Sequence, residues 1–557
     1  MRSSKILQRP EYSFNRSVYK AMGYSDDDLS RPIIGVVNSW NNLVPGHFNL
    51  REVSEYVKRG IYRGGCTYVE FGVIGACDGT AQGHVGMHYI LPSRELIASD
   101  IEVMVQAHQL DGIVLLGSCD KIVPAMLMAA ARLDIPAIIV PGGPMLGGME
   151  FAGRKSDLTT VSEALGMLNA GKINNEEYLA LEEQCCPSCG SCAFLGTANT
   201  MCCLAEGLGM TLPGSALIPA THPDRLRIAQ ETGAAICELV KKGITARRII
   251  TAESIENAVK ICLGISGSTN AVLHLIALAF EAELNVDVLG LFENLSKKTP
   301  QVVKVNPASK WDMEDFWKAG GIPRVVETME PLLNTDIITC TGETWRETIS
   351  NYQYKYPSNN EVIKSLSEPF GFTGGVSVLR GNLAPGTGIS KPGAIDPSIH
   401  KFTGTAKVFN SEEEAEHAIL NKCIQKGDVV VIRYEGPKGG PGMREMYKAM
   451  KYLYGLGLAK DTALITDGRF SGTNNGCFVG HISPEAAEGG PIAIVKDGDL
   501  ISLDVIKGTI HLHVDDEEIK ERFRDWQPPK TKFTKGYLGI YSRLAASAAE
   551  GAVLKLR

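Results

Sequence analysis

The sequence of 557 residues contains no uninterrupted apolar run of about 18 residues, the length that a membrane-spanning helix requires. It has no basic tract, and its formal net charge of −7 at pH 7 argues against nucleic-acid binding through charge. Residues 1–17 lack the apolar segment of a secretory signal, and no internal repeat or low-complexity segment is present. We therefore expect a globular cytoplasmic protein with neither a membrane nor a nucleic-acid partner.

The 14 cysteines are not expected to form a disulfide framework, because the chain has no secretory signal. Residues 185–192, CCPSCGSC, place four thiols at C-x-x-C spacing, which is typical of a metal or iron–sulfur site. Zinc is the competing occupant of such a site. Four other cysteines lie on apolar stretches and are predicted to be small buried hydrophobic residues: Cys237, Cys262, Cys340 and Cys423.

Residues 1–360 are predicted to form an α/β domain with a doubly wound parallel sheet. Its central stretch is residues 112–124, GIVLLGSCDKIVP, whose apolar run lacks polar alternation and so predicts a buried parallel strand. Pro124 suits the start of the helix that follows, since the first turn of a helix needs no N–H there. Strands and helices are expected to alternate on both sides of this central stretch, which is typical of a parallel sheet. Strands are predicted at residues 31–40, 68–74 and 137–140, and helices from about 49, at 93–108 with Ser93 as the cap, and at 125–133.

Residues 370–557 are predicted to form a second domain resembling a β-barrel. Short β-rich runs alternate there with glycine turns, as in FTGGVSVLRG, DVVVIRYEG and GPIAIVKDGD. Helices are expected at residues 412–425 and 443–454. Residues 343–369 are polar and weakly periodic, which indicates a linker between the two domains.

Reactive side chains follow the predicted strands of the first domain. Cys119, Asp120 and Lys121 directly follow the central strand, and Cys77 and Asp78 follow an earlier one. Ligands of open α/β sheets collect beyond the carboxyl ends of the strands. Carboxylates at these positions suit Mg²⁺, whereas thiolates suit an iron–sulfur cluster or zinc.

A site with one hard and one soft metal centre suits the removal of a hydroxyl group next to a carboxylate. Mg²⁺ would hold the carboxylate and the neighbouring hydroxyl, and an open iron would take the departing oxygen. A base must still remove the carbon-bound proton. Two glycine-rich loops of the second domain offer further polar groups, Glu435 in YEGP and Ser471 in DGRFSG.

Each of these residues also has an ordinary structural interpretation. Asp78 and Asp120 are acceptable helix N-caps, and Lys121 is able to form a plain ion pair with a carboxylate. Glu435 and Ser471 are residue types that are common in surface turns. The alternatives stay open when each residue is considered alone.

Taken together, the segments resemble the dihydroxy-acid/phosphogluconate dehydratase family of iron–sulfur dehydratases. The resemblance covers nearly the whole chain and is closest to the branched-chain amino-acid branch of the family. The matching text includes CDG (77–79), LPSREL (91–96), CDKIVPAMLMA (119–129), CPSCGSC (186–192), TANTM (197–201), GSTNAVLHL (267–275), GFTGGVSVLRGNLAP (371–385), YEGPKGGPGMREM (434–446), DGRFSG (467–472) and GHISPEA (480–486).

The resemblance implies specific ligands for two centres. It implies that Cys119 and Cys192 ligate an iron–sulfur cluster, of either the [2Fe–2S] or the [4Fe–4S] type. Mg²⁺ would be bound by three carboxylates and by a carbamate, a CO₂ adduct of a lysine. These implied Mg²⁺ ligands are Asp78, Asp120, Glu435 and carbamylated Lys121.

The resemblance also implies a catalytic base, a site location and an assembly. Ser471, as an alkoxide near the metal, would take the proton from the carbon next to the carboxylate. The site would lie in the cleft between the two domains, and the usual unit would be a homodimer. The carboxylate of Asp78 within CDG favours a branched-chain substrate, since sugar-acid dehydratases often have glutamate nearby.

Three segments depart from the family pattern. Some relatives with a [2Fe–2S] cluster have a third ligand cysteine where this chain has Pro45-Gly46-His47, and this absence resembles members with an oxygen-sensitive [4Fe–4S] cluster. A third thiol would then come from elsewhere, with Cys77, Cys186 and Cys189 as alternatives. Residues 473–481, TNNGCFVGH, and residues 383–397 also differ and are candidates to line the substrate pocket.

Three functional hypotheses follow. The first is a hydro-lyase that converts 2,3-dihydroxy-3-methylbutanoate and its ethyl homologue to 2-oxo acids in valine and isoleucine biosynthesis. The second keeps this chemistry but has a sugar acid (an aldonate) as the substrate. The third is a non-catalytic iron–sulfur or zinc protein that acts as a sensor or scaffold.

Overall fold

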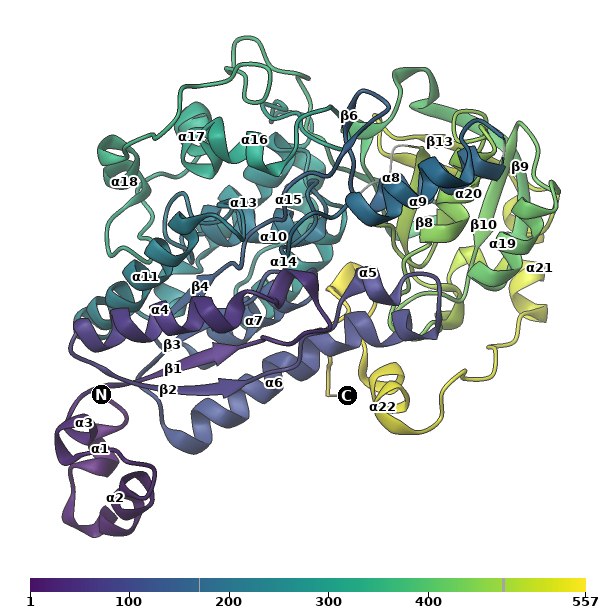
Figure 1. The fold of residues 1–557 in the computed structure, drawn as a ribbon. Coiled ribbons are helices and arrows are strands. Elements are labelled where there is room, and N and C mark those ends of the chain that lie inside the picture. The colour runs from purple at the N-terminus through teal and green to yellow at the C-terminus, as the bar shows by residue number, and fades with distance from the viewer. Residues whose placement is uncertain (170, 473–475, 557) are drawn as a thin grey trace.

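The computed structural model describes residues 1–169, 171–472 and 476–556 (Figure 1). Across these residues, no helix has both the length and the apolar character needed to cross a membrane. The chain begins with three short helices, α1 (Ser4–Leu7), α2 (Ser13–Lys20) and α3 (Asp26–Ser30). They precede the strands that organise the first part of the molecule.

The first part contains a four-stranded parallel sheet, as the sequence predicts. Its strands run in the order β2-β1-β3-β4. Because β1 and β3 are adjacent but their connections leave in opposite directions, the sheet is doubly wound and has a switch point between these two strands. The strands are β1 (Ile33–Asn38), β2 (Thr67–Gly72), β3 (Gly112–Leu116) and β4 (Ala137–Val140).

Helices cover both faces of this sheet (Figure 1). α4 (Leu50–Arg63) packs with α11 (Pro223–Lys242) on one face, and α6 (Ile90–His108) packs with α7 (Ile122–Leu133) on the other. The α4–α11 contact brings backbone against backbone: a Cβ added to Gly60 would lie 2.0 Å from the carbonyl oxygen of Gln230. Glycine is therefore required at this crossing.

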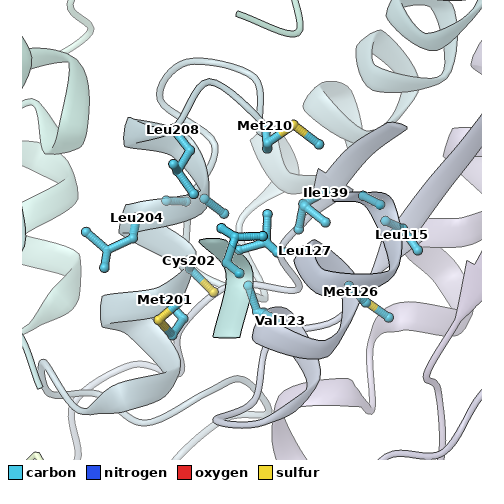
Figure 2. Packing of buried hydrophobic residues seen from close by; sticks show 14 of the residues in the cluster. Leu115, Val123, Met126, Leu127, Ile139, Met201, Cys202, Leu204, Leu208 and Met210 are labelled. Atoms are coloured by element: carbon cyan, nitrogen blue, oxygen red, sulfur yellow. The ribbon is translucent and has the colours of Figure 1, made fainter. Parts of the chain in front are cut away.

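The core of the first part lies between α7, β3, β4 and a further helix, α10 (Thr197–Gly207). Figure 2 shows Leu127 in the middle of this cluster, with Leu115 and Ile139 on one side and Met201 and Cys202 on the other. Strand β3 is buried at every position, as its uninterrupted apolar sequence predicts. The loops at its carboxyl end are thus anchored to a rigid core.

A helical layer follows α11. The segment predicted as a linker, residues 343–369, contains a helix whose Trp345 is buried, so the expectation of an unpacked connection is wrong. The helices are α12 (Ala246–Ile249), α13 (Ala252–Gly264), α14 (Asn270–Glu281), α15 (Val288–Leu295), α16 (Met313–Lys318), α17 (Gly321–Met329) and α18 (Trp345–Asn351).

The second part is a closed barrel of eight strands among the described residues, ordered β10-β11-β12-β8-β7-β14-β13-β9. It has its own apolar core, which includes Val429, Val431, Ile465 and Val479. The prediction of a β-barrel-like second part is confirmed. Its strands are β7 (Ser377–Gly381), β8 (Ala384–Ser390), β9 (Lys401–Phe409), β10 (Asp428–Ile432), β11 (Ala463–Thr466), β12 (Cys477–Ser483), β13 (Leu500–Asp504) and β14 (Thr509–Leu512), with helices α19 (Glu412–Leu420), α20 (Tyr447–Gly455), α21 (Asp516–Asp525) and α22 (Gly536–Leu544).

The two parts contact each other at several places. α8 (Leu158–Asn169) packs on α20, and the end of the chain returns to α6 (Figure 1). There Arg94 of α6 donates hydrogen bonds to the carbonyl oxygens of Gly551 at 2.7 Å and Ala552 at 3.1 Å. The exact division at residues 360–370 stays a prediction. Beside α8 lie β5 (Glu150–Phe151), β6 (Arg154–Lys155) and α9 (Asn175–Gln184).

Two local predictions are wrong. Ser93 does not cap α6, because the helix already begins at Ile90 and the Ser93 hydroxyl donates to the Ile90 carbonyl oxygen within the first turn. Cys423 is exposed, whereas Cys237, Cys262 and Cys340 are buried as expected. A short apolar stretch does not by itself determine which side of a turn faces the core.

Candidate active site

A small pocket of about 80 Å³ lies where loops of the parallel sheet meet loops of the barrel. It contains thiols, carboxylates, a serine and apolar side chains. Residues from the first part that line it are Cys77, Asp78, Gly79, Gln82, Cys119, Asp120, Leu158, Thr159, Cys192, Phe194, Gly196, Thr197 and Ala198, and those from the second part are Glu445, Tyr447, Ser471 and Gly472.

The pocket contains a group of three carboxylates. Asp78, Asp120 and Glu445 each place one oxygen within 4.8 Å of the others. Two buried cations balance them in part. The Lys121 ammonium lies 3.2 Å from Asp78 and also contacts Asp120, and the Arg469 guanidinium lies 3.3 Å from Asp78 and pairs with Glu445. Three carboxyl groups thus share two cations.

The backbone explains how these side chains reach the pocket. Asp78 is the first residue of α5 (Asp78–Ala81), and Asp120 and Lys121 occupy the turn between β3 and α7. No side-chain capping bond forms at the start of either helix, so Asp78 and Asp120 do not serve as N-caps. The predicted ion pair of Lys121 is present.

The charges shift the carboxyl groups in opposite directions. Burial and the neighbouring Asp78 raise the pKa of Asp120 to about 8. Burial also opposes ionisation of Asp78, but the Lys121 and Arg469 cations outweigh it and lower the Asp78 pKa. Crowded carboxylates of this kind favour the binding of a cation, because it relieves their mutual repulsion.

The carboxylate that joins the two aspartates is Glu445, not Glu435. Glu445 lies in an extended segment that bridges to Arg469. Gln82 donates to its second oxygen at 2.6 Å, and Asn270 donates to its first at 3.3 Å. These polar neighbours come from the first part, so Glu445 connects the barrel to the sheet.

Glu435 lies in a different buried cluster of the barrel. Its Oε1 accepts from the backbone N–H of Glu412 at 3.3 Å and lies 3.6 Å from Arg444 and 3.4 Å from Lys532. Burial raises its pKa to about 7. The structure thus leaves Glu435 outside the carboxylate group, and it is not a surface turn residue either.

The alternation of side chains along an extended segment explains why Glu445 and Arg444 do not both face the pocket. Arg444 and Glu445 are neighbours in an extended segment, so their side chains point to opposite sides. Arg444 pairs with Glu412 and Glu413, whereas Glu445 faces the pocket. The family-like text YEGPKGGPGMREM contains both glutamates. Alternation indicates that Arg444 and Glu445 face opposite sides, but it does not show which of the two faces the pocket.

The two cysteines named as cluster ligands, Cys119 and Cys192, both line the pocket beside the carboxylates. Cys119 is buried in the turn after β3, and Cys192 lies in the loop that leads into α10. A third thiol, Cys77, lines the same pocket. Soft sulfur ligands and hard oxygen ligands therefore meet in one small space.

His47 supports the turn that contains Cys119. Its ring is buried between the loops that follow β1 and β3, with Nδ1 2.9 Å from the carbonyl oxygen of Ser39. The backbone N–H groups of Ser118 and Cys119 both donate to its Nε2, at 3.2 and 3.3 Å. The proton must then lie on Nδ1, and burial keeps the ring neutral by lowering its pKa to about 4.

Ser471 lines the pocket from the loop that follows β11. The next residue is fixed by a buried cation: Lys391, from the end of β8, donates to the carbonyl oxygen of Gly472 at 3.1 Å. Lys391 lies within one of the departing segments, residues 383–397, and acts on the pocket through this contact. No described residue of that segment lines the pocket itself.

Apolar side chains form the rest of the pocket wall. The apolar lining consists of Leu158, Phe194, Ala198 and the ring of Tyr447. The Tyr447 hydroxyl donates a hydrogen bond to Ser162 at 2.8 Å. The wall thus offers hydrophobic contact and few polar partners. Residues 473–475, part of the second departing segment, lie outside the described residues.

Comparisons with known proteins agree with this architecture. The family model described as dihydroxy-acid/6-phosphogluconate dehydratase N-terminal matches residues 31–348, and its C-terminal counterpart matches residues 361–552. Proteins named dihydroxy-acid dehydratase from Acetivibrio thermocellus and Pyrococcus furiosus are 49% and 50% identical to this chain, with all of both chains covered in each case. The chain therefore belongs to the dihydroxy-acid/6-phosphogluconate dehydratase family.

Proposed function

We propose that this protein is a dihydroxy-acid dehydratase of branched-chain amino-acid biosynthesis. It removes water from 2,3-dihydroxy-3-methylbutanoate and its ethyl homologue and releases the 2-oxo acids. The observation that supports this most directly is the convergence of three carboxylates, three thiols and Ser471 on one pocket. The full-length similarity to proteins named dihydroxy-acid dehydratase supports the same reaction.

The residues present fit a magnesium ion. Asp78 Oδ1 and Gln82 Oε1 are buried at the carboxylate group and have no hydrogen-bond partner among the described residues. Such acceptors suit a hard cation that takes oxygen ligands. We propose Asp78, Asp120 and Glu445 as the Mg²⁺ ligands, with Glu445 in the place first assigned to Glu435.

Lys121 completes this proposal as a carbamate. Its amine lies between Asp78 and Asp120 and is fully buried. Addition of CO₂ would replace a positive charge by a negative one and supply a further oxygen for Mg²⁺. Intact-mass measurement at neutral pH under CO₂ is expected to show an adduct that disappears in Lys121→Arg.

The thiols fit an iron–sulfur cluster, for which we propose Cys119 and Cys192 as ligands. When bound, the two centres supply Lewis acids for the substrate carboxylate and for the hydroxyl that departs. Ser471 takes the proton from C2 as the C3 hydroxyl leaves, and the resulting enol tautomerises to the 2-oxo acid. Lys391 holds the backbone next to Ser471 and thereby fixes the position of its hydroxyl.

The pocket wall favours a branched alkyl substrate over a sugar acid. Leu158, Phe194 and Ala198 offer contact to methyl or ethyl groups. The additional hydroxyl groups of an aldonate would lose hydrogen bonds to water without finding partners on this wall, at a cost of about 1–3 kcal/mol each. We therefore prefer the branched dihydroxy acid.

We further propose that the protein works in the cytoplasm as a homodimer. The family resemblance supports the homodimer, and a biosynthetic role is consistent with the cytoplasm. Sedimentation equilibrium of the anaerobically purified protein is expected to give twice the chain mass of 60.1 kDa. A monomeric mass would refute the assembly.

The decisive experiment combines metal analysis with a matched pair of variants. Anaerobically purified protein is expected to contain iron and sulfide, to require Mg²⁺, and to convert 2,3-dihydroxy-3-methylbutanoate faster than an aldonate. Glu445→Gln should lose Mg²⁺-dependent turnover, whereas Glu435→Gln should retain Mg²⁺ affinity. Zinc without sulfide, or turnover of the sugar acid alone, would contradict the proposal.

A further inference from the structure

We propose that Cys77 is the third cysteine ligand of the iron–sulfur cluster in this protein, together with Cys119 and Cys192. The inference rests on the proposed function and identifies a ligand that the family resemblance left open. Among the described residues that line the pocket, these three are the cysteines. They come from three separate loops, so the fold brings together thiols that are far apart in the sequence.

Cys77 and Cys119 line the same pocket of about 80 Å³. Cys77 immediately precedes α5, and Cys119 lies in the turn that precedes α7. Both thiols thus lie at the carboxyl side of the sheet, where a cluster iron needs several thiolates at once.

A repeated dipeptide supports the assignment. Cys77-Asp78 and Cys119-Asp120 both follow parallel strands of the sheet, β2 and β3. The two aspartates converge on the carboxylate group, and the two cysteines line the pocket beside it. Each dipeptide therefore presents a soft ligand and a hard ligand in the same order. If Cys119 is a cluster ligand beside the Mg²⁺ ligand Asp120, the same role for Cys77 beside Asp78 follows from this geometry.

The other two alternatives lie elsewhere. Cys186 is exposed, and Cys185 lies against it with 3.7 Å between the sulfurs. Cys189 lines a separate surface groove that also contains Trp40 and His222. Neither Cys186 nor Cys189 is among the residues of the pocket.

Gly46 shows why the loop after β1 supplies no ligand here. Its backbone approaches the Cys119 sulfur so closely that an added Cβ would lie 2.8 Å from it. Position 46 is therefore next to the cluster cysteine, but its residue has no thiol. Cys77 supplies a sulfur to the same neighbour, Cys119, from the loop after β2.

The number of thiols in the pocket also suits this role. Clusters of both types are commonly held by four cysteines. Three protein thiolates would therefore leave one coordination position that a substrate oxygen could take.

The test compares alanine variants purified without oxygen. After gel filtration, Cys77→Ala is expected to contain at most about one third of the iron and sulfide per chain that the unaltered protein contains. Its visible absorption spectrum should also change. Cys186→Ala and Cys189→Ala serve as matched controls and should keep both. Full iron and sulfide in Cys77→Ala with an unchanged spectrum would overturn the inference. If the unaltered protein itself contains no iron and sulfide, the proposed function fails as well.

A second measurement avoids any effect of the substitution on folding. Iodoacetamide should label Cys77 of the intact holoprotein at least about tenfold more slowly than after removal of iron with a chelator, because a bound thiolate is not free to react. Exposed Cys423 should react equally in both states. Labelling of Cys77 in the holoprotein at the rate of Cys423 would refute the assignment.

Discussion

Replacement of His47 tests how the turn that contains Cys119 is held in place. The neutral ring donates from Nδ1 to the Ser39 carbonyl and accepts two backbone N–H groups at Nε2. His47→Ala removes the acceptor of two buried donors, and each unsatisfied donor costs about 1–3 kcal/mol. With the cavity left by the ring, we expect a loss of about 3–5 kcal/mol in the free energy of unfolding.

His47→Gln is the matched control. A glutamine amide oxygen is able to occupy the position of Nε2 and accept from Ser118 and Cys119, while the bond to Ser39 is lost. We expect a loss of about 1–2 kcal/mol at pH 7.5. Urea unfolding of the metal-free proteins, measured in parallel, gives both values. A His47→Ala protein within about 1 kcal/mol of the unaltered one would refute this account of the turn.

The pH dependence gives an independent check of the same contact. The folded-state pKa of His47 is about 4 and the unfolded value is 6.5, so the unfolded chain binds the extra proton between these values. Stability due to neutral His47 is therefore full above pH 6.5, falls as the pH drops towards 4, and changes no further below. The loss across the window is about 3 kcal/mol, at about 1.4 kcal/mol per pKa unit.

Glutamine does not titrate, so His47→Gln lacks this contribution. The stability advantage of the unaltered protein should shrink between pH 7.5 and 4.5 and then reverse. The comparison cancels the effect of other buried histidines, which are present in both proteins. An advantage that stays constant over this range would show that His47 is not held neutral.

Three further substitutions test other parts of the structure. Lys391→Met removes the donor to the Gly472 carbonyl, so the loop that contains Ser471 loses its support. We expect kcat to fall at least about tenfold with the iron and magnesium content unchanged. An unchanged kcat would contradict the positioning role of Lys391. Gly60→Ala places a methyl group against the Gln230 carbonyl and should cost at least about 3 kcal/mol in urea unfolding. Phe194→Ala opens the apolar wall and should raise KM for the branched substrate about tenfold or more, which substrate saturation curves measure.

Much of the fold could be predicted from the sequence because its signals are local. The uninterrupted apolar run Gly112–Leu116 predicts a buried strand, and β4 has the predicted bounds Ala137–Val140. The register and closure of the barrel could not be predicted, since they depend on pairings such as β14 with β7, which are separated by over a hundred residues. The packed helix around Trp345 was missed because its environment is formed by distant segments.

The candidate site shows the same limit. Cys119, Asp120 and Lys121 were identified because they directly follow a strand, and general rules place ligands there. Glu445 was not predicted as a ligand, because that prediction requires knowledge of which side of an extended segment faces the sheet. That orientation is set by the pairing of Glu445 with Arg469, and no local pattern reports it.

The arrangement explains why the chain needs both of its parts. The switch point between β1 and β3 brings the loops with His47 and Cys119 together, so the sheet alone is able to assemble thiols and two aspartates. It lacks the third carboxylate and the serine, which reach the pocket only from the barrel as Glu445 and Ser471. Arg469 spans this junction, since it comes from the barrel but pairs with Asp78 of the sheet. A displacement of the two parts would therefore separate Ser471, the proposed proton acceptor, from the proposed ligands, and correct docking of the barrel is a condition for the proposed reaction.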